Sequence, residues 1–408
     1  MQTPVQRGHM NAPKNSNLPT KILVVDDDST VGQSLEKPFK GYNIEVAKAK
    51  DFASALTLFE EENYSVVLVE LEFEPTNGLV LIQRFRNNLK QEKRASGMVL
   101  LTGNSRKPSD EAMIKELGDI ESLVKPLKPI NVLPVISRAY AKHNLLMEYE
   151  RFREKVLTEF AKGTDLKSLT DAVKQKFPEY GVRAFELLME LHLAAGSHDQ
   201  ALHTINNLLA KEPNNTLYLS AKGQFSLLAG KTEDALFALE AAHKIAPLGL
   251  DRMALLEDAY LKNREAKKAL EIMELRVQFI NGNLDAKFGM ANKLQNAGED
   301  EVAKGFVRKH ASPAEVVRYY NNKGVAMSQN GDCKGAIIEY QRALAFFPSS
   351  KENFRIHYNI ALARLKLRTT EDLNSAVGSL KKCLELAPDF EKAKSALEQV
   401  QNQGKKAS

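Results

Sequence analysis

The chain contains no tryptophan and only two cysteines, Cys333 and Cys383, among its 408 residues. Two cysteines so far apart argue against a disulfide framework and a cysteine-based metal site, and they indicate a reducing compartment. No apolar run approaches the roughly 18 residues that a membrane-spanning helix needs. The polar N-terminal segment also lacks the apolar stretch of a signal peptide. We therefore expect a cytoplasmic protein without a membrane segment.

A strong charge of either sign is also missing. The 57 lysines and arginines nearly balance the 52 aspartates and glutamates, which leaves a net charge of +5. So small an excess argues against nucleic acid as a partner. The eight histidines show no ligand spacing, and the sequence contains no nucleophile-elbow or phosphate-loop motif. We therefore expect that the chain is not an enzyme.

Residues 20 to 143 alternate short apolar runs with helical patterns. Short, nearly continuous apolar strands that alternate with helices predict a parallel sheet covered on both faces. The expected strands lie at residues 21–25, 43–46, 65–69, 98–101 and 123–124.

Polar residues stand directly after four of these strands. Asp26 and Asp27 follow the first, Glu70 the third, Thr102 the fourth and Lys125 the fifth. In an open parallel sheet, these strand ends share one edge, where ligands bind. Clustered carboxylates suit Mg²⁺, the one cofactor that the sequence suggests. A phosphoryl oxygen at this edge would be held by the metal, Thr102 and Lys125.

The order and spacing of these pieces resemble the receiver domain of response regulators over about 125 residues. The matching segments are 24–27, 75–78, 101–103 and 124–126. The resemblance implies a flavodoxin-like, doubly wound α/β fold with a metal at Asp26 and Asp27 and a phosphate site at Thr102 and Lys125. It also implies a histidine kinase or another signalling protein as a partner.

The sequence departs from the receiver pattern at three positions. The phosphate-accepting aspartate is replaced by Glu70, the loop proline Pro75 is shifted by one residue, and Ser122 replaces the aromatic switch residue. A positional error of about 1 Å, the size of one methylene, can cost roughly a hundredfold in rate. We therefore expect the usual phosphotransfer to be lost. Glu70 either reaches Lys125 and fixes a state like the phosphorylated one, or is a drifted residue in a domain kept for its surface.

The segment 144–180 is expected to form connecting helices. Pro134 suits the first turn of a helix, and no proline or glycine follows between residues 135 and 162. An apolar stripe recurs along this helix at steps of four, three, four and four residues. It either packs on the helices that follow or forms a coiled coil in a homodimer. The stripe consists of Leu145, Tyr149, Phe152, Val156 and Phe160.

Residues 181–400 repeat with a period near 34. A small alanine recurs at spacings of 34, 34, 34, 33 and 40, and four of these alanines have a glycine five residues before them. This pattern resembles six tetratricopeptide repeats, each a helical hairpin, which together build an all-α superhelix. The third copy has Arg264 at the glycine position, and the last copy carries an insertion at 368–375. The alanines are Ala201, Ala235, Ala269, Ala303, Ala336 and Ala376.

The resemblance to these repeats implies a concave groove that binds an extended peptide or a partner's helix. Asparagine offers a donor and an acceptor together, which suits a peptide unit, and arginine favours an acidic partner. The groove residues that the resemblance indicates are Arg318, Asn321, Asn322, Arg355, Tyr358 and Asn359.

Five segments therefore make up the chain. Flexible tails are expected at 1–19 and 401–408, an α/β receiver-like domain at 20–143, connecting helices at 144–180 and the repeats at 181–400. The favoured function is a signalling adaptor of two-component type, which joins an atypical receiver to a protein-binding scaffold. One alternative is a phosphorylatable response regulator of a phosphorelay. Another is an RNA-binding repeat protein.

Overall fold

The computed structural model describes residues 18–73, 76–103, 106–280 and 282–407. Most of the predicted N-terminal tail and Pro75 of the predicted turn therefore lie outside the described residues. The chain divides into two compact units, Met1–Asn281 and Gly282–Ser408, and this division falls inside the predicted repeat array. No helix in the described part is long and apolar enough to cross a membrane.

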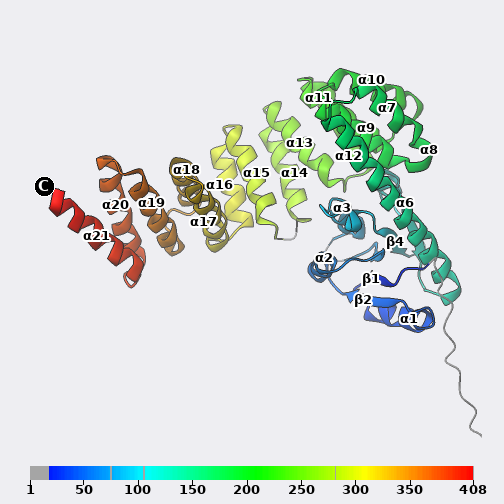
Figure 1. The fold of residues 1–408 in the computed structure, drawn as a ribbon, viewed down its shortest axis with the longest axis horizontal. Coiled ribbons are helices and arrows are strands. Elements are labelled where there is room, and N and C mark those ends of the chain that lie inside the picture. The colour runs from blue at the N-terminus through cyan, green and yellow to red at the C-terminus, as the bar shows by residue number, and fades with distance from the viewer. Residues whose placement is uncertain (1–17, 74–75, 104–105, 281, 408) are drawn as a thin grey trace, which may run out of the picture. The chain divides into compact units, whose positions relative to one another are not determined.

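The first unit begins with a parallel sheet, which confirms the predicted α/β fold class (Figure 1). In the described part of the chain the sheet has five strands in the order β2-β1-β3-β4-β5. The central strands β1, β3 and β4 are almost wholly buried, as expected for continuous apolar runs. The strands are β1 (Lys21–Val25), β2 (Glu45–Ala49), β3 (Val66–Glu70), β4 (Gly97–Thr102) and β5 (Ile120–Val124).

Helices cover both faces of this sheet. Alternate residues of each strand point to opposite faces, so Ile22 joins one apolar core and Leu23 the other. The core around Ile22 includes residues of α1 and α6, and the core around Leu23 includes residues of α2, α3 and α5. The helices are α1 (Ser29–Lys40), α2 (Phe52–Glu61), α3 (Gly78–Arg86), α4 (Gln91–Arg94), α5 (Pro108–Leu117) and α6 (Pro129–Ala161).

Helix α6 continues from the sheet into the helical region (Figure 1). It begins at Pro129, so Pro134 lies inside the helix and not in its first turn. Proline at the first position fits because that backbone group has no helical partner to lose. The stripe that includes Tyr149 and Val156 packs against α7 (Leu166–Gln175), α8 (Phe177–Tyr180) and α9 (Val182–Ala194). The structure thus shows the first of the two predicted arrangements, packing on the helices that follow.

Antiparallel helical hairpins make up the rest of the described chain, which confirms the predicted all-α architecture. In the first unit these are α9 (Val182–Ala194) with α10 (His198–Lys211), α11 (Thr216–Leu228) with α12 (Thr232–Ile245), and α13 (Leu250–Lys262) with α14 (Ala266–Val277). In the second unit they are α15 (Leu284–Asn296) with α16 (Asp300–His310), α17 (Pro313–Gln329) with α18 (Cys333–Phe346), and α19 (Phe354–Leu367) with α20 (Thr370–Leu386), followed by α21 (Glu391–Ala407).

The periodic residues occupy the positions that their chemistry suggests. All six recurring alanines are fully buried in the second helices of the hairpins. Arg264 adopts a left-handed backbone conformation with a φ of 61°, where other copies have glycine. Most of the insertion at 368–375 lengthens α20 to 17 residues. Helix α21 continues to Ala407 through the predicted C-terminal tail, because residues 401–407 are mostly good helix formers.

The sheet region and the hairpins of the first unit share a hydrophobic core. Met113 of α5 belongs to the same buried cluster as Leu250 and Met253 of α13. The Gln83 side chain adds two hydrogen bonds of 2.9 Å, to the backbone oxygen of Leu248 and from the backbone nitrogen of Leu250. The hairpins up to α14 therefore pack as one body with the sheet region.

Candidate functional site

The carboxyl ends of the strands bring three of the predicted site residues into direct contact. Asp26 follows β1, Glu70 ends β3 and Lys125 follows β5. The Lys125 ammonium lies 2.9 Å from Asp26 Oδ2, and it also contacts Glu70 Oε2. One lysine thus contacts two acids whose side chains are 2% and 9% exposed.

Backbone contacts hold these side chains in place. The Lys125 backbone nitrogen donates to Thr102 O at 2.9 Å, which joins the ends of β4 and β5. A Cβ on Gly78 would lie 2.0 Å from Glu70 O, so only glycine allows α3 to begin this close to β3. The Asp26 carboxylate also accepts from the Asp28 backbone nitrogen at 2.9 Å.

Burial makes Glu70 a titratable group near neutral pH. Loss of solvent raises the pKa of Glu70 to about 7, despite the opposing effect of Lys125. Burial alone would lower the pKa of Lys125, but its hydrogen bonds to Glu70 and Asp26 outweigh burial and raise it. Burial, with a smaller contribution from the neighbouring Asp26, therefore leaves Glu70 only partly ionised near neutrality.

The remaining predicted residues of this edge do not join that contact. The Thr102 hydroxyl is buried and donates to Gly103 O at 2.9 Å. Asp27 is exposed, and Ser122 accepts a hydrogen bond of 2.8 Å from Arg106 Nη1. Arg106 therefore contacts the position where the receiver pattern has an aromatic residue.

The arrangement only partly fits a metal ion. Asp26, Asp27 and Glu70 supply the oxygen atoms that Mg²⁺ prefers. However, Lys125 takes up one oxygen each of Asp26 and Glu70. No group of three or more aspartate, glutamate, histidine or cysteine side chains within the described ranges is placed to hold a metal.

Comparison with known proteins identifies this part of the chain. Residues 22–137 match the family described as the response regulator receiver domain. This segment is a receiver domain. Such domains typically bind Mg²⁺ at their phosphorylation site and interact with kinases or other signalling proteins.

Curated relatives match over the receiver domain only. The response regulator protein GraR of Staphylococcus aureus strain JH9 is 28% identical over 139 residues, which cover 34% of this chain and 58% of that protein. The same figures hold for GraR of strain Newman. This chain therefore spans little more than half the length of these relatives.

Solved structures also cover the receiver domain. A response regulator described as putative from Chloroflexus aurantiacus is 24% identical, covers 30% of this chain and 98% of its own, and has a TM-score of 0.28. The chemotaxis protein CheY4 of Vibrio cholerae is 22% identical, covers 29% of this chain and 98% of its own, and has a TM-score of 0.27.

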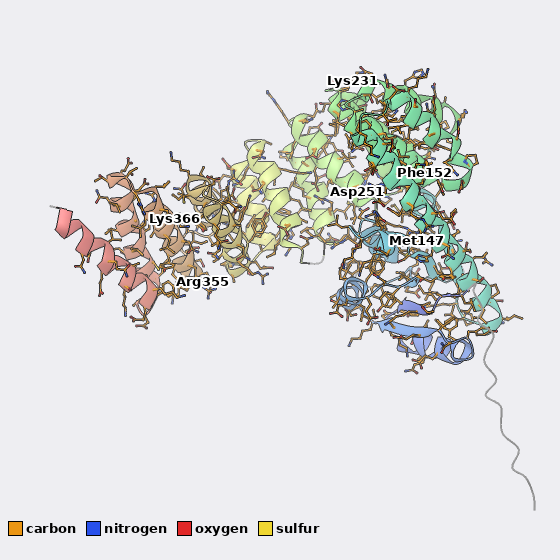
Figure 2. The ribbon with its side chains drawn as sticks, in the orientation of Figure 1. Met147, Phe152, Lys231, Asp251, Arg355 and Lys366 are labelled. Carbon is orange, nitrogen blue, oxygen red and sulfur yellow. The ribbon has the colours of Figure 1, made fainter. Side chains whose placement is uncertain are left out.

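The predicted groove residues lie on α17 and α19 of the second unit. Asn359 Nδ2 donates to Asn321 Oδ1, which places the two helices side by side. Two turns further along, Lys366 donates to Ser328 O at 3.2 Å, and Figure 2 labels Lys366 on this helix. The hydrogen bond between the asparagines means that this pair has a packing role in addition to any binding role.

Arginines flank this asparagine pair. Arg318, Asn322 and Arg355 are exposed. The Arg355 guanidinium lies 5.4 Å from the centre of the Phe354 ring (Figure 2). Tyr358 is half-buried, and its ring centre is 5.1 Å from that of Phe390, so this predicted groove residue packs within the unit.

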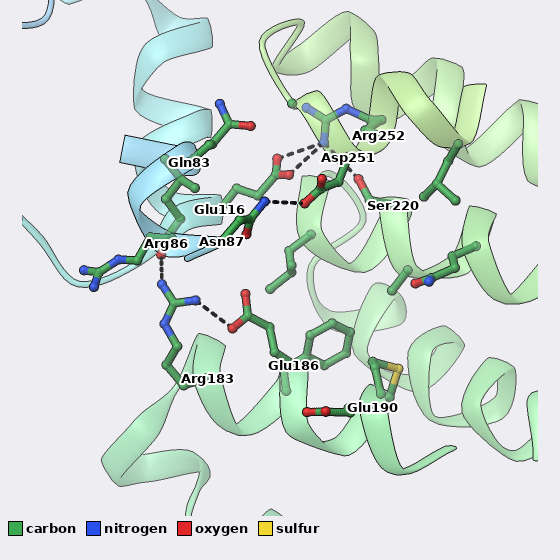
Figure 3. A pocket seen from close by; sticks show the side chains of 18 of the residues that line it. Gln83, Arg86, Asn87, Glu116, Arg183, Glu186, Glu190, Ser220, Asp251 and Arg252 are labelled. Carbon is green, nitrogen blue, oxygen red and sulfur yellow. Dashed lines mark hydrogen bonds and ion pairs between the residues drawn. The ribbon is translucent and has the colours of Figure 1, made fainter. Parts of the chain in front are cut away.

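Sequence reasoning missed a charged contact between the receiver domain and the hairpins. Arg252 of α13 is fully buried as a side chain and donates to both carboxylate oxygens of Glu116 of α5 at 2.9 Å. It also donates to Ser220 Oγ at 2.8 Å (Figure 3). The sequence signal was an arginine among the apolar residues of a first helix, but nothing in the sequence names its partner.

Proposed function

We propose that this chain is a non-catalytic signalling adaptor in which an atypical receiver domain is joined to a tetratricopeptide-type scaffold for other proteins. The observation that carries the proposal is the contact of Lys125 with both Glu70 and Asp26. A receiver that accepts phosphate needs that lysine to stabilise the phosphoryl group. In this chain the lysine already contacts the carboxyl groups of Glu70 and Asp26.

The contact favours the first of the two interpretations of Glu70. Its longer side chain places a carboxyl oxygen against Lys125, where a phosphorylated aspartate would place a phosphoryl oxygen. The domain then rests in one state without a donor. If Mg²⁺ binds, Asp26 and Asp27 would hold it, and its charge would compete with Lys125 for Asp26.

Chemical labelling tests this proposal. We expect the full chain, incubated with Mg²⁺ and a small acyl phosphate, to show no stoichiometric mass increase, because the Glu70 carboxyl is mispositioned and occupied by Lys125. The matched variant is Glu70→Asp, which removes one methylene and leaves Asp26, Asp27, Thr102 and Lys125 in place. Labelling of the variant alone would assign the loss to the side-chain length.

A stoichiometric phosphate adduct on the natural chain would contradict the proposal. It would favour the alternative, a phosphorylatable response regulator. Unchanged mass in both proteins would show that the loop near Pro75 also prevents the reaction.

The scaffold role is supported by the second unit. Its exposed arginines and hydrogen-bonding asparagines form one strip across α17 and α19, which suits an extended acidic peptide. The strip consists of Arg318, Asn321, Asn322, Arg355 and Asn359.

Replacing Arg318, Asn322 and Arg355 together by alanine should weaken binding of an acidic peptide by at most several kcal/mol. Charged hydrogen bonds contribute roughly 1.5–3 kcal/mol each and are not additive. The melting temperature should stay the same because all three side chains are exposed. Asn321 and Asn359 are left unchanged because they bond to each other.

Affinity should be measured by titration calorimetry at two salt concentrations, using a partner recovered with the natural chain. The exposed Lys381 and Lys382 of α20, replaced together by alanine, provide a control on a different helix. Equal affinity of the triple variant and the natural chain would place the interface elsewhere.

A further inference from the structure

A cavity of about 440 Å³ lies in the first unit, between the receiver domain and the helices that follow it. A second cavity of about 340 Å³ shares part of its lining, including Arg86, Asn87 and Arg183 (Figure 3). Volumes of this size are typical of sites for small molecules. The walls come from the receiver domain, α6, α9 and, at Asp251, α13, all of which belong to one compact unit.

All the arginines that line the larger cavity, except Arg86, are paired with acids that also line it. In two of the three pairs, the guanidinium donates to both oxygens of a carboxylate, at 2.6–3.1 Å. The pairs are Arg94 with Glu150, Arg153 with Glu190, and Arg183 with Glu186. These carboxylates are therefore not free to neutralise a further cation.

Arg86 is the exception. The residue is 7% exposed, and its Nη1 donates to Arg94 O at 2.6 Å and Ser96 O at 2.9 Å. Its other edge, Nε and Nη2, is buried and has no hydrogen-bond partner within the described residues. In Figure 3 the Arg86 side chain extends away from Arg252. A buried charge with an unsatisfied edge is costly, and this edge belongs to a residue that lines both cavities.

The Nε–Nη2 edge of a guanidinium presents two parallel N–H groups that match two oxygens of a carboxylate or phosphate. We propose that the larger cavity binds a small molecule through a carboxylate or phosphate group, and that the Arg86 side chain turns this buried edge toward the cavity to hold it. The amides of Asn87 and Asn88 and the ring of Tyr149 line the same cavity and would contact the rest of the ligand.

The charges around the Nε–Nη2 edge of Arg86 favour an anionic ligand. Burial and, to a smaller extent, the nearby Arg183 together lower the pKa of Arg86 to about 9. A bound anion would reverse both effects. Because the cavity wall combines the receiver domain with α6 and α9, such a ligand also stabilises their packing against each other.

A tryptophan reporter can test this site, since the chain has none of its own. Leu89 lines the larger cavity and is 94% exposed, so Leu89→Trp places the reporter there without disturbing a core. The full-length variant is titrated with inorganic phosphate and with acetate, each matched by NaCl at equal ionic strength. We expect a saturable fluorescence change with at least one of the two anions, and the responsive anion identifies the class.

Arg86→Met in the reporter protein should weaken the binding of that anion at least tenfold, because the two parallel donors are gone. Arg84→Met, on the same helix but outside both cavities, is the matched control and should keep the affinity. If Arg86→Met does not fold, Arg86→Lys keeps the charge but not the paired donors. It should then weaken binding at least fivefold.

Two results would overturn the proposal. One is a response to phosphate and acetate no larger than that to NaCl, which would mean that water alone satisfies Arg86. The other is an equal affinity in the Arg86 and Arg84 variants. The melting temperature of the natural chain, measured with the same salts, gives a readout independent of any variant and should rise saturably with the bound anion.

Discussion

At the scale of single residues, the buried Glu70 carboxyl makes the receiver domain sensitive to pH. Its pKa is raised to about 7 from an ordinary value of 4.5, chiefly by burial. The folded state therefore holds this proton more tightly than the unfolded chain does. The contribution of Glu70 to stability is fully present below pH 4.5 and is lost as the pH rises through 7.

We expect Glu70→Gln to flatten the fall of the melting temperature between pH 5 and pH 7, because an amide does not ionise. Thermal unfolding of the full chain at several pH values checks this. Asp27→Asn, at the exposed neighbour of Asp26, is the control and should leave the slope unchanged. Parallel curves for Glu70→Gln and the natural chain would show that Glu70 keeps its ordinary pKa.

The sequence predicted the positions of single site residues only where the end of a strand fixes them. The pattern placed Asp26, Glu70 and Lys125 at one edge, because parallel strands end together. It could not predict that the Thr102 hydroxyl turns to Gly103, since a side-chain rotamer depends on packing. Nor could it distinguish the buried, half-satisfied Arg86 from the many exposed arginines.

At the scale of the hairpins, Arg264 is a strained exception to a glycine position. It has a φ of 61°, where four other copies have glycine with positive φ. The left-handed conformation costs a residue with a Cβ roughly 1–2 kcal/mol. Gly196, Gly230, Gly298 and Gly331 avoid this cost.

We therefore expect Arg264→Gly to stabilise the first unit by about 1 kcal/mol, measured by thermal unfolding. Lys267→Gly in the exposed face of α14 is the control of opposite sign, because glycine inside a helix costs about 0.5–1 kcal/mol. Equal destabilisation by both changes would mean that the Arg264 side chain makes compensating contacts.

The hairpins were largely predictable because their period is encoded in small residues. Buried alanines such as Ala201 and Ala336 mark close helix crossings, so their spacing alone indicated where second helices lie. The structure of the insertion at 368–375 was harder to predict from the sequence. It lengthens α20, because residues such as Glu371, Asp372 and Leu373 suit a helix once Thr369 caps it.

At the scale of the whole molecule, the sequence suggested modules that the structure does not separate. The expected boundary at residue 180 lies inside one compact unit, because Met113, Leu250 and Met253 bury one another across it. From the sequence alone, apolar residues such as Leu250 and Met253 are interpreted as the internal core of a repeat. Periodicity within a repeat cannot reveal contacts with a partner 136 residues away, and only the folded chain brings α5 against α13.

The charged contact across this junction supplies the last prediction. Glu116→Ala should destabilise the first unit by about 3–5 kcal/mol, because it leaves the fully buried Arg252 guanidinium without its carboxylate. Lys115→Ala, one residue earlier on α5, breaks an exposed ion pair with Glu212 and should cost no more than about 1 kcal/mol. Thermal unfolding of the full-length variants measures both.

The double variant Glu116→Ala with Arg252→Met separates a buried charge from a lost contact. If the cost comes from the unpaired guanidinium, removing that charge should recover much of the stability, since buried ion pairs are often replaceable by apolar side chains. If the double variant is as unstable as Glu116→Ala alone, the cost comes from lost packing between α5 and α13. A small effect of Glu116→Ala, equal to that of Lys115→Ala, would mean that water reaches Arg252 and that the receiver domain packs on the hairpins less tightly than the burial of that side chain implies.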